Sequence, residues 1–244
     1  MYSEARYLTV GDHGLSVEFG NDLDQATNRM VQKLKFAMEM ANIEGVIETV
    51  PTIRSLFVHY TPSKIRGDDL IFKIKEMEKK IEDVSMPVSR LFEVPIVYGA
   101  EYGADFDTVL KILCIAPKEL IKAHSGKEYT ILQTGFIGGS AYFKIPSPLD
   151  ALPRKKTPNM GVPIGSVLIA GGLGSAFKPL AGPTGWYWIG TSPLNQWFPE
   201  KDPPLLINTG DRIIYKPVDK NEFLDIKKQV QEGCYDSEIF NTTG

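Results

Sequence analysis

Short strand-like segments alternate with prolines over residues 126–215, and this pattern restricts the fold more than any other feature of the chain. The strand-like segments are 129–133, 166–170, 186–189 and 212–215. The prolines between and around them are Pro146, Pro148, Pro153, Pro158, Pro163, Pro179, Pro183, Pro193 and Pro199. Many short strands joined by rigid turns are typical of a closed barrel or a sandwich. The pattern therefore predicts a mainly β domain.

The first part of the chain has a different pattern, in which strands alternate with amphipathic helices. Residues 6–10, 15–19, 46–50 and 55–60 are strand-like, and apolar residues recur at helical spacing over 30–41 and 70–84. Asp22 and Gln25 have the spacing of a capping box at the start of the first helix. The order β-β-α-β-β-α predicts two helices on one face of a small antiparallel sheet.

The predicted fold class is α+β, with a domain boundary at Ser85-Met86-Pro87. Residues 1–87 form a small α/β domain, residues 88–220 the β domain, and residues 221–244 a C-terminal helix and tail. The β domain opens with a strand over 91–98. A helix capped by Asp105 and a second helix over 117–124 follow it.

Composition excludes several classes of function. The net charge of -3 gives no basic surface for nucleic acid. No apolar run is long enough to span a membrane, and the N-terminus does not have the pattern of a signal peptide. The two cysteines form no CxxC, and no histidine motif for a metal occurs. We expect a cytoplasmic protein without a metal site.

Two residues near the end of the second helix of the β domain are candidates for catalysis. His124 lies in the last helical turn, where the helix dipole favours a protonated imidazole. Glu128 follows four residues later and could orient the ring or pair with it. The simpler alternative is a helix-end histidine beside a surface glutamate, and spacing alone favours that alternative.

Binding residues are expected in the loops and turns of the β domain. Arg154, in a basic proline-rich loop, could hold a carboxylate or phosphate. The glycine-rich turn at Gly171 and Gly172, followed by Lys178, could offer backbone N–H groups to an anion, or it could be a plain tight turn. Among the aromatic residues, most of which belong to the core by default, one or two could line a ligand cleft.

Motif pieces along most of the chain resemble the KipI family, which includes the B subunit of bacterial 5-oxoprolinase and is also called allophanate hydrolase subunit 1. The family is related to the carboxyltransferase region of urea amidolyase. The pieces that carry the resemblance include Val94-Pro95-Ile96-Val97-Tyr98-Gly99, His124-Ser125, Glu128-Tyr129, Gly135-Phe136, Pro153-Arg154, Gly165-Ser166-Val167 and Gly185-Trp186.

The resemblance implies a small α/β N-terminal domain followed by a cyclophilin-like β-barrel domain. It also implies a hydrolase that acts on a small amide or lactam, uses ATP, and needs two partner proteins, one KipA-like and one LamB/YcsF-like. In that context the expected catalytic residues are His124 and Glu128. The expected substrate-binding residues are Arg154, Phe136, Tyr142, Gly171, Gly172 and Lys178.

The chain departs from the family pattern at residues of the kind that line the pocket. Gly-Phe-x-Pro-Gly-Phe becomes Gly135-Phe136-Ile137-Gly138-Gly139-Ser140, and Ser-Pro-Gly-Gly-Trp becomes Gly182-Pro183-Thr184-Gly185-Trp186. These departures leave two alternatives to the hydrolase component. One is a KipI-like protein that binds and inhibits a histidine kinase, and the other is an inactive structural subunit.

Overall fold

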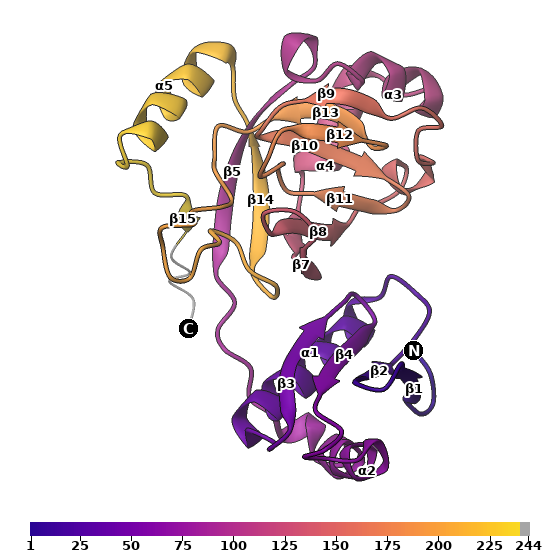
Figure 1. The fold of residues 1–244 in the computed structure, drawn as a ribbon. Helices are drawn as coiled ribbons and strands as arrows, with labels where there is room; N and C mark the ends of the chain where they lie inside the picture. Colours follow the sequence, from indigo (N-terminus) through magenta and orange to yellow (C-terminus); the bar gives the residue numbers. More distant parts are fainter. Residues whose placement is uncertain (240–244) are drawn as a thin grey trace. The chain divides into compact units, whose positions relative to one another are not determined.

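The computed structural model of the chain describes residues 1–239 (Figure 1). The chain divides into two compact units between Val88 and Ser89, directly after the Ser85-Met86-Pro87 segment. Residues 240–244, the end of the expected C-terminal tail, lie outside the described residues.

The N-terminal unit is a four-stranded antiparallel sheet with two helices. The strand order is β1-β2-β4-β3. In chain order its elements are β1 (Arg6–Val10), β2 (Gly14–Glu18), α1 (Gln25–Ala41), β3 (Val46–Pro51), β4 (Ser55–Tyr60), α2 (Gly67–Glu78) and the short 3-10 helix η1 (Ile81–Asp83).

Alternation along the central strands places both helices on one face of this sheet. Leu15 and Val17 of β2 and Leu56 and Val58 of β4 are buried, because side chains two residues apart point to the same face. They share one core with residues of both helices, namely Val31, Leu34, Met38, Leu70 and Ile74. The predicted arrangement of two helices on one face is confirmed.

The predicted cap of α1 is wrong by two residues. The helix begins at Gln25, so its N-cap is Asp24, whose carboxylate accepts a hydrogen bond from the backbone N–H of Thr27 at 2.9 Å. A capping side chain must come directly before the first helical residue to reach the free N–H groups of the first turn. Asp22 is too far upstream for this role.

The C-terminal unit is mainly β. Its elements are β5 (Leu91–Tyr98), η2 (Ala100–Tyr102), α3 (Phe106–Leu113), α4 (Pro117–Ser125), β6 (Glu128–Thr130), β7 (Gln133–Gly135), β8 (Ser140–Lys144), η3 (Leu149–Ala151), β9 (Asn159–Val162), β10 (Ser166–Ala170), β11 (Leu173–Ser175), β12 (Gly182–Thr184), β13 (Tyr187–Thr191), β14 (Arg212–Pro217), α5 (Lys220–Gln231) and β15 (Glu238–Ile239).

The main sheet of this unit curls into a half-barrel. Its strand order is β6-β14-β5-β13-β10-β11-β8-β7, with β15 paired to β5. The strands at the two ends, β6 and β7, are separated in sequence only by Ile131 and Leu132. The N–H of Leu132 also donates to the carbonyl of Tyr142 in β8 at 2.8 Å. A sheet whose end strands are so closely joined has to curl, and the predicted α+β class with a β-barrel is confirmed.

One expected strand, 129–133, is two strands in the structure. Residues Glu128–Thr130 pair with β14, whereas Gln133–Gly135 pair with β8. The chain turns between them because it passes from one end of the curled sheet to the other.

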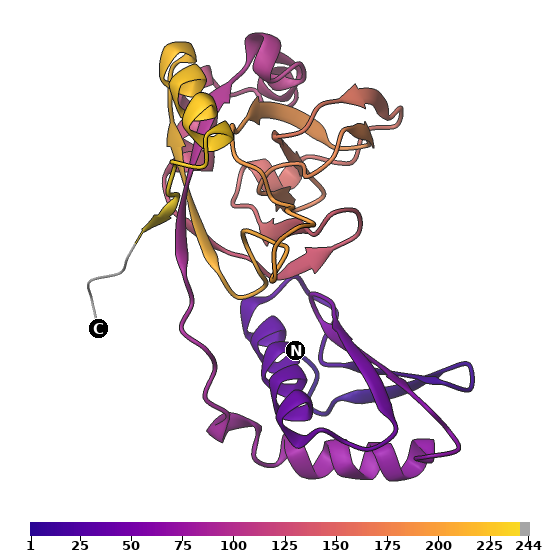
Figure 2. The ribbon, with the colours of Figure 1, turned by 60° about the vertical axis from the view of Figure 1, so that its left-hand side comes forward.

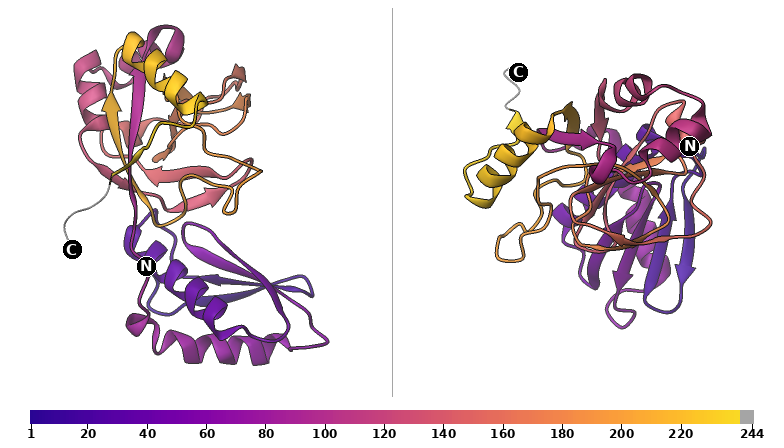
Figure 3. Two further views of the ribbon diagram at one scale, coloured as in Figure 1. Left: turned by 90° about the vertical axis from the view of Figure 1, so that its left-hand side faces the viewer. Right: turned by 90° about the horizontal axis from the view of Figure 1, so that it is seen from above.

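Helices pack against both sides of the β5–β14 pair. These two strands run parallel, from Arg212 beside Leu91 to Pro217 beside Ile96. Figure 3 shows them side by side in its left view, and Figure 2 shows α5 along β5. The helix α4 contacts β14, and α3 contacts β13. None of the helices within residues 1–239 is long and apolar enough to cross a membrane.

Candidate functional site

His124 lies in the core of the C-terminal unit. Its side chain is completely buried, and its ring packs 4.3 Å from the ring of Tyr215, with Tyr129 and Phe143 further away. The Nδ1 atom shares a hydrogen bond of 2.7 Å with the hydroxyl of Tyr98. The Nε2 atom has no hydrogen-bond partner among the described residues.

This environment keeps the imidazole neutral. Burial lowers the pKa of His124 from 6.5 to about 3, because an enclosed ring loses the hydration that would stabilise its charged form. The expectation that the helix dipole would favour a protonated ring is therefore wrong. Loss of hydration exceeds the dipole effect, which is only about 0.3–1 kcal/mol at an exposed site.

Glu128 does not pair with His124. Its carboxylate forms an ion pair with Arg212 of the neighbouring strand at 2.7 Å, and its side chain is 44% exposed. The four-residue spacing fails because α4 ends at Ser125 and Glu128 already belongs to β6. The predicted polar pair is wrong, and the structure agrees with the alternative of a helix-end histidine and a surface glutamate.

Two neighbouring residues of β8, Tyr142 and Phe143, show that the sheet has two different faces. Phe143 is fully buried and belongs to the core around His124, whereas Tyr142 points to the opposite face. There the ring of Tyr142 lies 5.6 Å from that of Trp186. His124 and Tyr142, both expected in one pocket, are therefore on different sides of the sheet.

Lys178 and Trp186 flank the segment that carries β12, and Trp186 is on this opposite side. The Nζ atom of Lys178 is 3.9 Å from the position that a β-carbon on Gly182 would occupy. The strand β12 runs from Gly182 to Thr184, and Trp186, two residues further on, meets Tyr142. The Lys178 side chain is partly buried, and this burial lowers its pKa. It forms no ion pair with an acidic group among the described residues.

Phe136 lies beside this segment, at the tip of the β7–β8 hairpin. A β-carbon on Gly138 would lie 3.0 Å from Pro179, so the tip packs against the residue that follows Lys178. The side chain of Phe136 is 86% exposed, and its backbone is left-handed, with φ 62°. A bulky residue in that conformation is strained, and such strain is concentrated at functional sites. We call Tyr142, Trp186, Lys178 and Phe136 the Tyr142 face.

A buried amide fixes the hairpin tip. Gln196 is 1% exposed, and its Nε2 donates to the carbonyl of Gly139 at 2.9 Å and to that of Ile207 at 2.7 Å. Gly139 has a left-handed backbone, with φ 68°, and a β-carbon there would lie 2.3 Å from the end of the Leu205 side chain, so this position favours glycine. Gln196 and Leu205 thus fix the backbone of the hairpin tip, while the side chain of Phe136 remains exposed to solvent.

Gly171 and Gly172 form a plain tight turn rather than an anion cradle. They join β10 to β11, and both have a left-handed backbone, with φ 58° and 80°. Two such residues are what a type I′ hairpin turn requires. The N–H of Gly171 donates to the carbonyl of Leu152 at 2.7 Å, so it is not free for a ligand.

Arg154 lies at this turn, away from Lys178. Its Cγ is 3.9 Å from the position of a β-carbon on Gly171, and its side chain is exposed. The pairing of Leu173 with Lys144 places the turn at one end of β8, and the pairing of Gly135 with Ser140 places the hairpin tip at the other. The two ends are about 13 Å apart along the strand. The expected gathering of His124, Glu128 and Arg154 in one cleft is not found.

A partly buried ion pair positions the Arg154 loop, and sequence reasoning missed it. The Nζ of Lys155 donates to Asp105 at 2.6 Å, and the same carboxylate accepts the N–H of Trp188 at 3.0 Å. Asp105 is the N-cap of α3, but its side chain does not cap the helix because it holds these two groups instead. No local pattern links residues that are so far apart in sequence.

The described residues contain no cluster of three or more His, Cys, Asp or Glu side chains that could hold a metal ion. Within residues 1–239, the chemistry available at the Tyr142 face is that of one ammonium group, two aromatic rings with polar atoms and an exposed phenyl ring. Such a surface can attract an anion and stack against a planar group.

Comparison with known proteins decides the family. The profile of the carboxyltransferase domain, subdomain C and D, matches residues 5–207. The chain belongs to this carboxyltransferase family. The sequence-based recognition is confirmed, because related proteins are named as the B subunit of 5-oxoprolinase.

Three relatives define how far the similarity extends. A protein of Bacillus subtilis (strain 168), named as the B subunit of 5-oxoprolinase, is 29% identical over 90% of this chain and 95% of its own length. The crystal structure of TTHA0988 is 27% identical, with a TM-score of 0.72 over 84% of this chain and 40% of that chain. Kluyveromyces lactis urea carboxylase has a TM-score of 0.75 at 18% identity, covering 96% of this chain and 24% of that chain.

The carboxyltransferase fold thus occurs both as a chain of this size and as part of longer chains. This chain spans less than half of TTHA0988 and about a quarter of the urea carboxylase. At 18% identity the urea carboxylase shows the fold alone.

Proposed function

We propose that this chain is the B subunit of an ATP-dependent 5-oxoprolinase complex and acts with a KipA-like protein and a LamB/YcsF-like protein. The observation that carries the proposal is the match to almost the full length of a protein named as the B subunit of 5-oxoprolinase. A subunit name applies to a component of a larger assembly, and this chain has the extent of that component. The complex would work in the cytoplasm, where ATP is available.

The reaction opens the lactam ring of 5-oxoproline to give glutamate. An amide carbonyl resists water because its oxygen and nitrogen are poor leaving groups. In our proposal the carbonyl oxygen first takes the γ-phosphoryl group of ATP, which leaves as ADP, and a water molecule then adds to the carbon. The C–N bond breaks, the ring nitrogen takes a proton and an acyl phosphate remains. A second water molecule hydrolyses this acyl phosphate to the carboxylate of glutamate and free phosphate. The contribution of protein groups to such a reaction is mainly positioning and charge stabilisation.

In this chain the group best suited to that role is Lys178. Its ammonium group is partly buried and has no acidic neighbour to neutralise it among the described residues. An arriving carboxylate or phosphate would compensate the cost of burial, so the site favours an anion. Tyr142 and Trp186 would pack against the planar ring of the substrate. His124, which is neutral and enclosed, would support the fold and take no part in proton transfer.

The test is reconstitution with the natural partners. The chain would be purified together with the KipA-like and LamB/YcsF-like proteins of its own genome, and glutamate release from 5-oxoproline would be measured with and without ATP. We expect release only with ATP and all three proteins. Lys178→Met should lower kcat/KM by about tenfold or more, the loss that follows removal of one electrostatic contact. Lys118→Met, on the exposed side of α4, is the matched control.

Two results would contradict the proposal. One is an assembled three-protein complex that releases no glutamate, and the other is full activity in the absence of this chain. Full activity of the Lys178→Met complex would leave the 5-oxoprolinase assignment standing but would remove Lys178 from the site.

One observation favours a second function, that of a protein-binding regulator. Phe136 and Ile137 are 86% and 52% exposed at a tip that is otherwise rigidly held. Adjacent exposed apolar side chains are typical of a contact with another protein. The candidate partner is the helical region of a histidine kinase. Inhibition of kinase autophosphorylation by the chain, abolished in Phe136→Ser, would support this function, and unchanged autophosphorylation would exclude it.

A further inference from the structure

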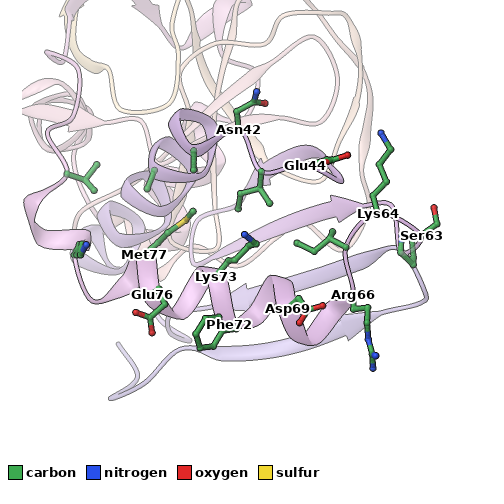
Figure 4. Close-up of a pocket in the computed structure, with 17 residues that line it drawn as sticks. Asn42, Glu44, Ser63, Lys64, Arg66, Asp69, Phe72, Lys73, Glu76 and Met77 are labelled. Atoms are coloured by element: carbon green, nitrogen blue, oxygen red, sulfur yellow. The ribbon is translucent and has the colours of Figure 1, made fainter.

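A groove of about 1020 Å³ lies between α1 and α2 of the N-terminal unit (Figure 4). Every residue that lines it belongs to this unit, from Ala37 of α1 to Val84 after η1. Along α2 and just beyond its end, the lining residues run from Asp69 to Lys80. The groove therefore follows the full length of the helix, which is about 18 Å for 12 residues.

Apolar side chains form part of the wall of the groove. Ile43, Ile65 and Met77 line it, together with Phe72, whose side chain is 66% exposed. Figure 4 shows Met77 pointing from α2 toward α1. A large aromatic residue that stays in solvent at the edge of an apolar groove is typical of a surface that another molecule covers.

Basic groups outnumber acidic ones along the groove by one, since its lining contains Lys64, Arg66, Lys73 and Lys80 as well as Glu44, Asp69 and Glu76. Lys64, Lys73 and Lys80 line it, and none of the three has an ion-pair partner within residues 1–239. Figure 4 shows Lys73 pointing toward α1, whereas Glu76 points away on the other side of α2. Glu76 is also already paired with Lys79. Glu44 and Asp69 also line the groove but form no ion pair with these lysines within residues 1–239, so the three ammonium groups stay available to a partner.

We propose that this groove binds an amphipathic helix of a partner protein, with acidic residues beside its apolar stripe. Two neighbouring helices present a channel into which the side-chain ridges of a third helix fit. The apolar stripe would contact Phe72, Met77 and Ile43, and the acidic residues would lie against Lys64, Lys73 and Lys80. The length of the groove suits a helix of about three turns.

The proposal goes beyond the 5-oxoprolinase assignment and does not depend on it. All of its residues lie in the N-terminal unit, whereas the Tyr142 face lies in the C-terminal unit. A binding experiment with the groove can therefore fail while reconstituted 5-oxoprolinase activity remains, and the reverse also holds.

The test uses two synthetic peptides and the full chain. Each peptide is a stapled helix of about 15 residues with a leucine stripe, long enough to be stable once stapled. One carries glutamates beside the stripe and the other carries lysines at the same positions. Fluorescence anisotropy measures the affinity of each peptide. We expect the acidic peptide to bind about tenfold more tightly than the basic peptide at low salt.

Variants of the full chain locate the binding. Lys73→Glu combined with Lys80→Glu should weaken the acidic peptide by about tenfold or more and strengthen the basic one. Phe72→Ala should weaken both peptides. The matched control is Lys118→Glu combined with Lys227→Glu, which changes the same number of exposed lysines in the C-terminal unit. This control should bind both peptides as the unchanged chain does.

Amide chemical shifts of the isotope-labelled full chain provide an independent readout, since the acidic peptide should shift signals of α1 and α2. The proposal would be overturned by absence of measurable binding, by equal affinity for the two peptides, or by unchanged affinity in the Lys73→Glu, Lys80→Glu variant. Shifts confined to the C-terminal unit would also overturn it.

Discussion

The imidazole of His124 is enclosed by tyrosine rings, and it illustrates how surroundings decide the role of a titratable residue. The hydroxyl of Tyr129 donates to the backbone carbonyl of His124 at 2.8 Å, and the hydroxyl of Tyr215 donates to that of Ala176 at 2.8 Å. Burial raises the pKa of both phenols, so all of these groups stay neutral. A neutral, hydrogen-bonded cluster of this kind contributes to a unique packing of the core.

Stability of the C-terminal unit should fall at mildly acidic pH because of His124. Its pKa is about 3 when folded and about 6.5 when unfolded. Between these values the unfolded chain binds a proton that the folded chain excludes, so the stabilisation is present above pH 6.5 and is lost as the pH falls. We expect about 2 kcal/mol less unfolding free energy from this group at pH 5 than at pH 7.

Urea unfolding of the natural chain and of His124→Phe at both pH values measures this contribution. The variant should be less sensitive to pH than the natural chain by about that amount. His13→Gln serves as the control, since His13 is exposed on the β1–β2 turn. Identical pH dependence of the natural chain and His124→Phe would contradict the prediction.

Gly174 is needed for packing. A β-carbon there would lie 2.3 Å from the ring of Phe143, which is itself fully buried and unable to move aside. Gly174→Ala should therefore lower the unfolding free energy by about 1–3 kcal/mol, the usual cost of overpacking a core. Gly161→Ala, where a β-carbon would meet nothing within 4 Å, should leave the urea midpoint nearly unchanged. Equal urea midpoints for the two variants would contradict the prediction, because they would show that Phe143 can shift to accommodate a β-carbon on Gly174.

At the scale of elements, the start of α1 gives a direct comparison between the expected and the observed cap. Asp24→Ala removes the acceptor for the N–H and hydroxyl of Thr27, and it should destabilise the N-terminal unit by about 1 kcal/mol. Asp22→Ala, at the position that the sequence pattern suggested, should have no effect. Thermal unfolding followed by circular dichroism would measure the stability of both variants. A larger loss of stability in Asp22→Ala than in Asp24→Ala would show that Asp22 is the cap.

Elements with strong local periodicity could be predicted from the sequence, and those defined by distant partners could not. The strands Leu91–Tyr98 and Ser166–Ala170 have the expected bounds because alternation or a continuous apolar run marks them. The break at Ile131-Leu132 has no local signal, since it reflects a change of partner from β14 to β8.

The candidate site also has residues that local sequence could suggest and contacts that depend on distant partners. Phe136, Tyr142 and Lys178 are expected from the sequence as binding residues, and this stays a prediction. The structure shows Tyr142 against Trp186, and the hairpin tip that carries Phe136 against Pro179, the residue after Lys178. The sequence could not show that His124 is enclosed, because the tyrosines around it come from three separate strands. Their convergence depends on the curl of the sheet.

At the scale of the whole molecule, the two units have separate hydrophobic cores. The core of the N-terminal unit contains only residues up to Ile81, and the other core begins at Phe92. Domains of fewer than 90 residues often fold alone when they bury a core of this kind.

The fragment 1–88 should therefore fold by itself. We expect helical and strand signals in its circular dichroism spectrum and a cooperative urea transition. A fragment that ends at Arg66 is the control, because it lacks α2 and with it the buried Leu70 and Ile74. This shorter fragment should show no cooperative transition. A 1–88 fragment without such a transition would mean that the first unit needs the rest of the chain.

The parallel pairing of β5 with β14 has a consequence for synthesis on the ribosome. The strand β5 leaves the exit tunnel first among the strands of its sheet, but Leu91 pairs with Arg212, more than a hundred residues downstream. Until β14 emerges, β5 presents unpaired backbone groups and the apolar side chains of Phe92, Val94 and Ile96. The nascent chain thus carries an incomplete sheet for most of its translation, and a holding chaperone would find its binding site there.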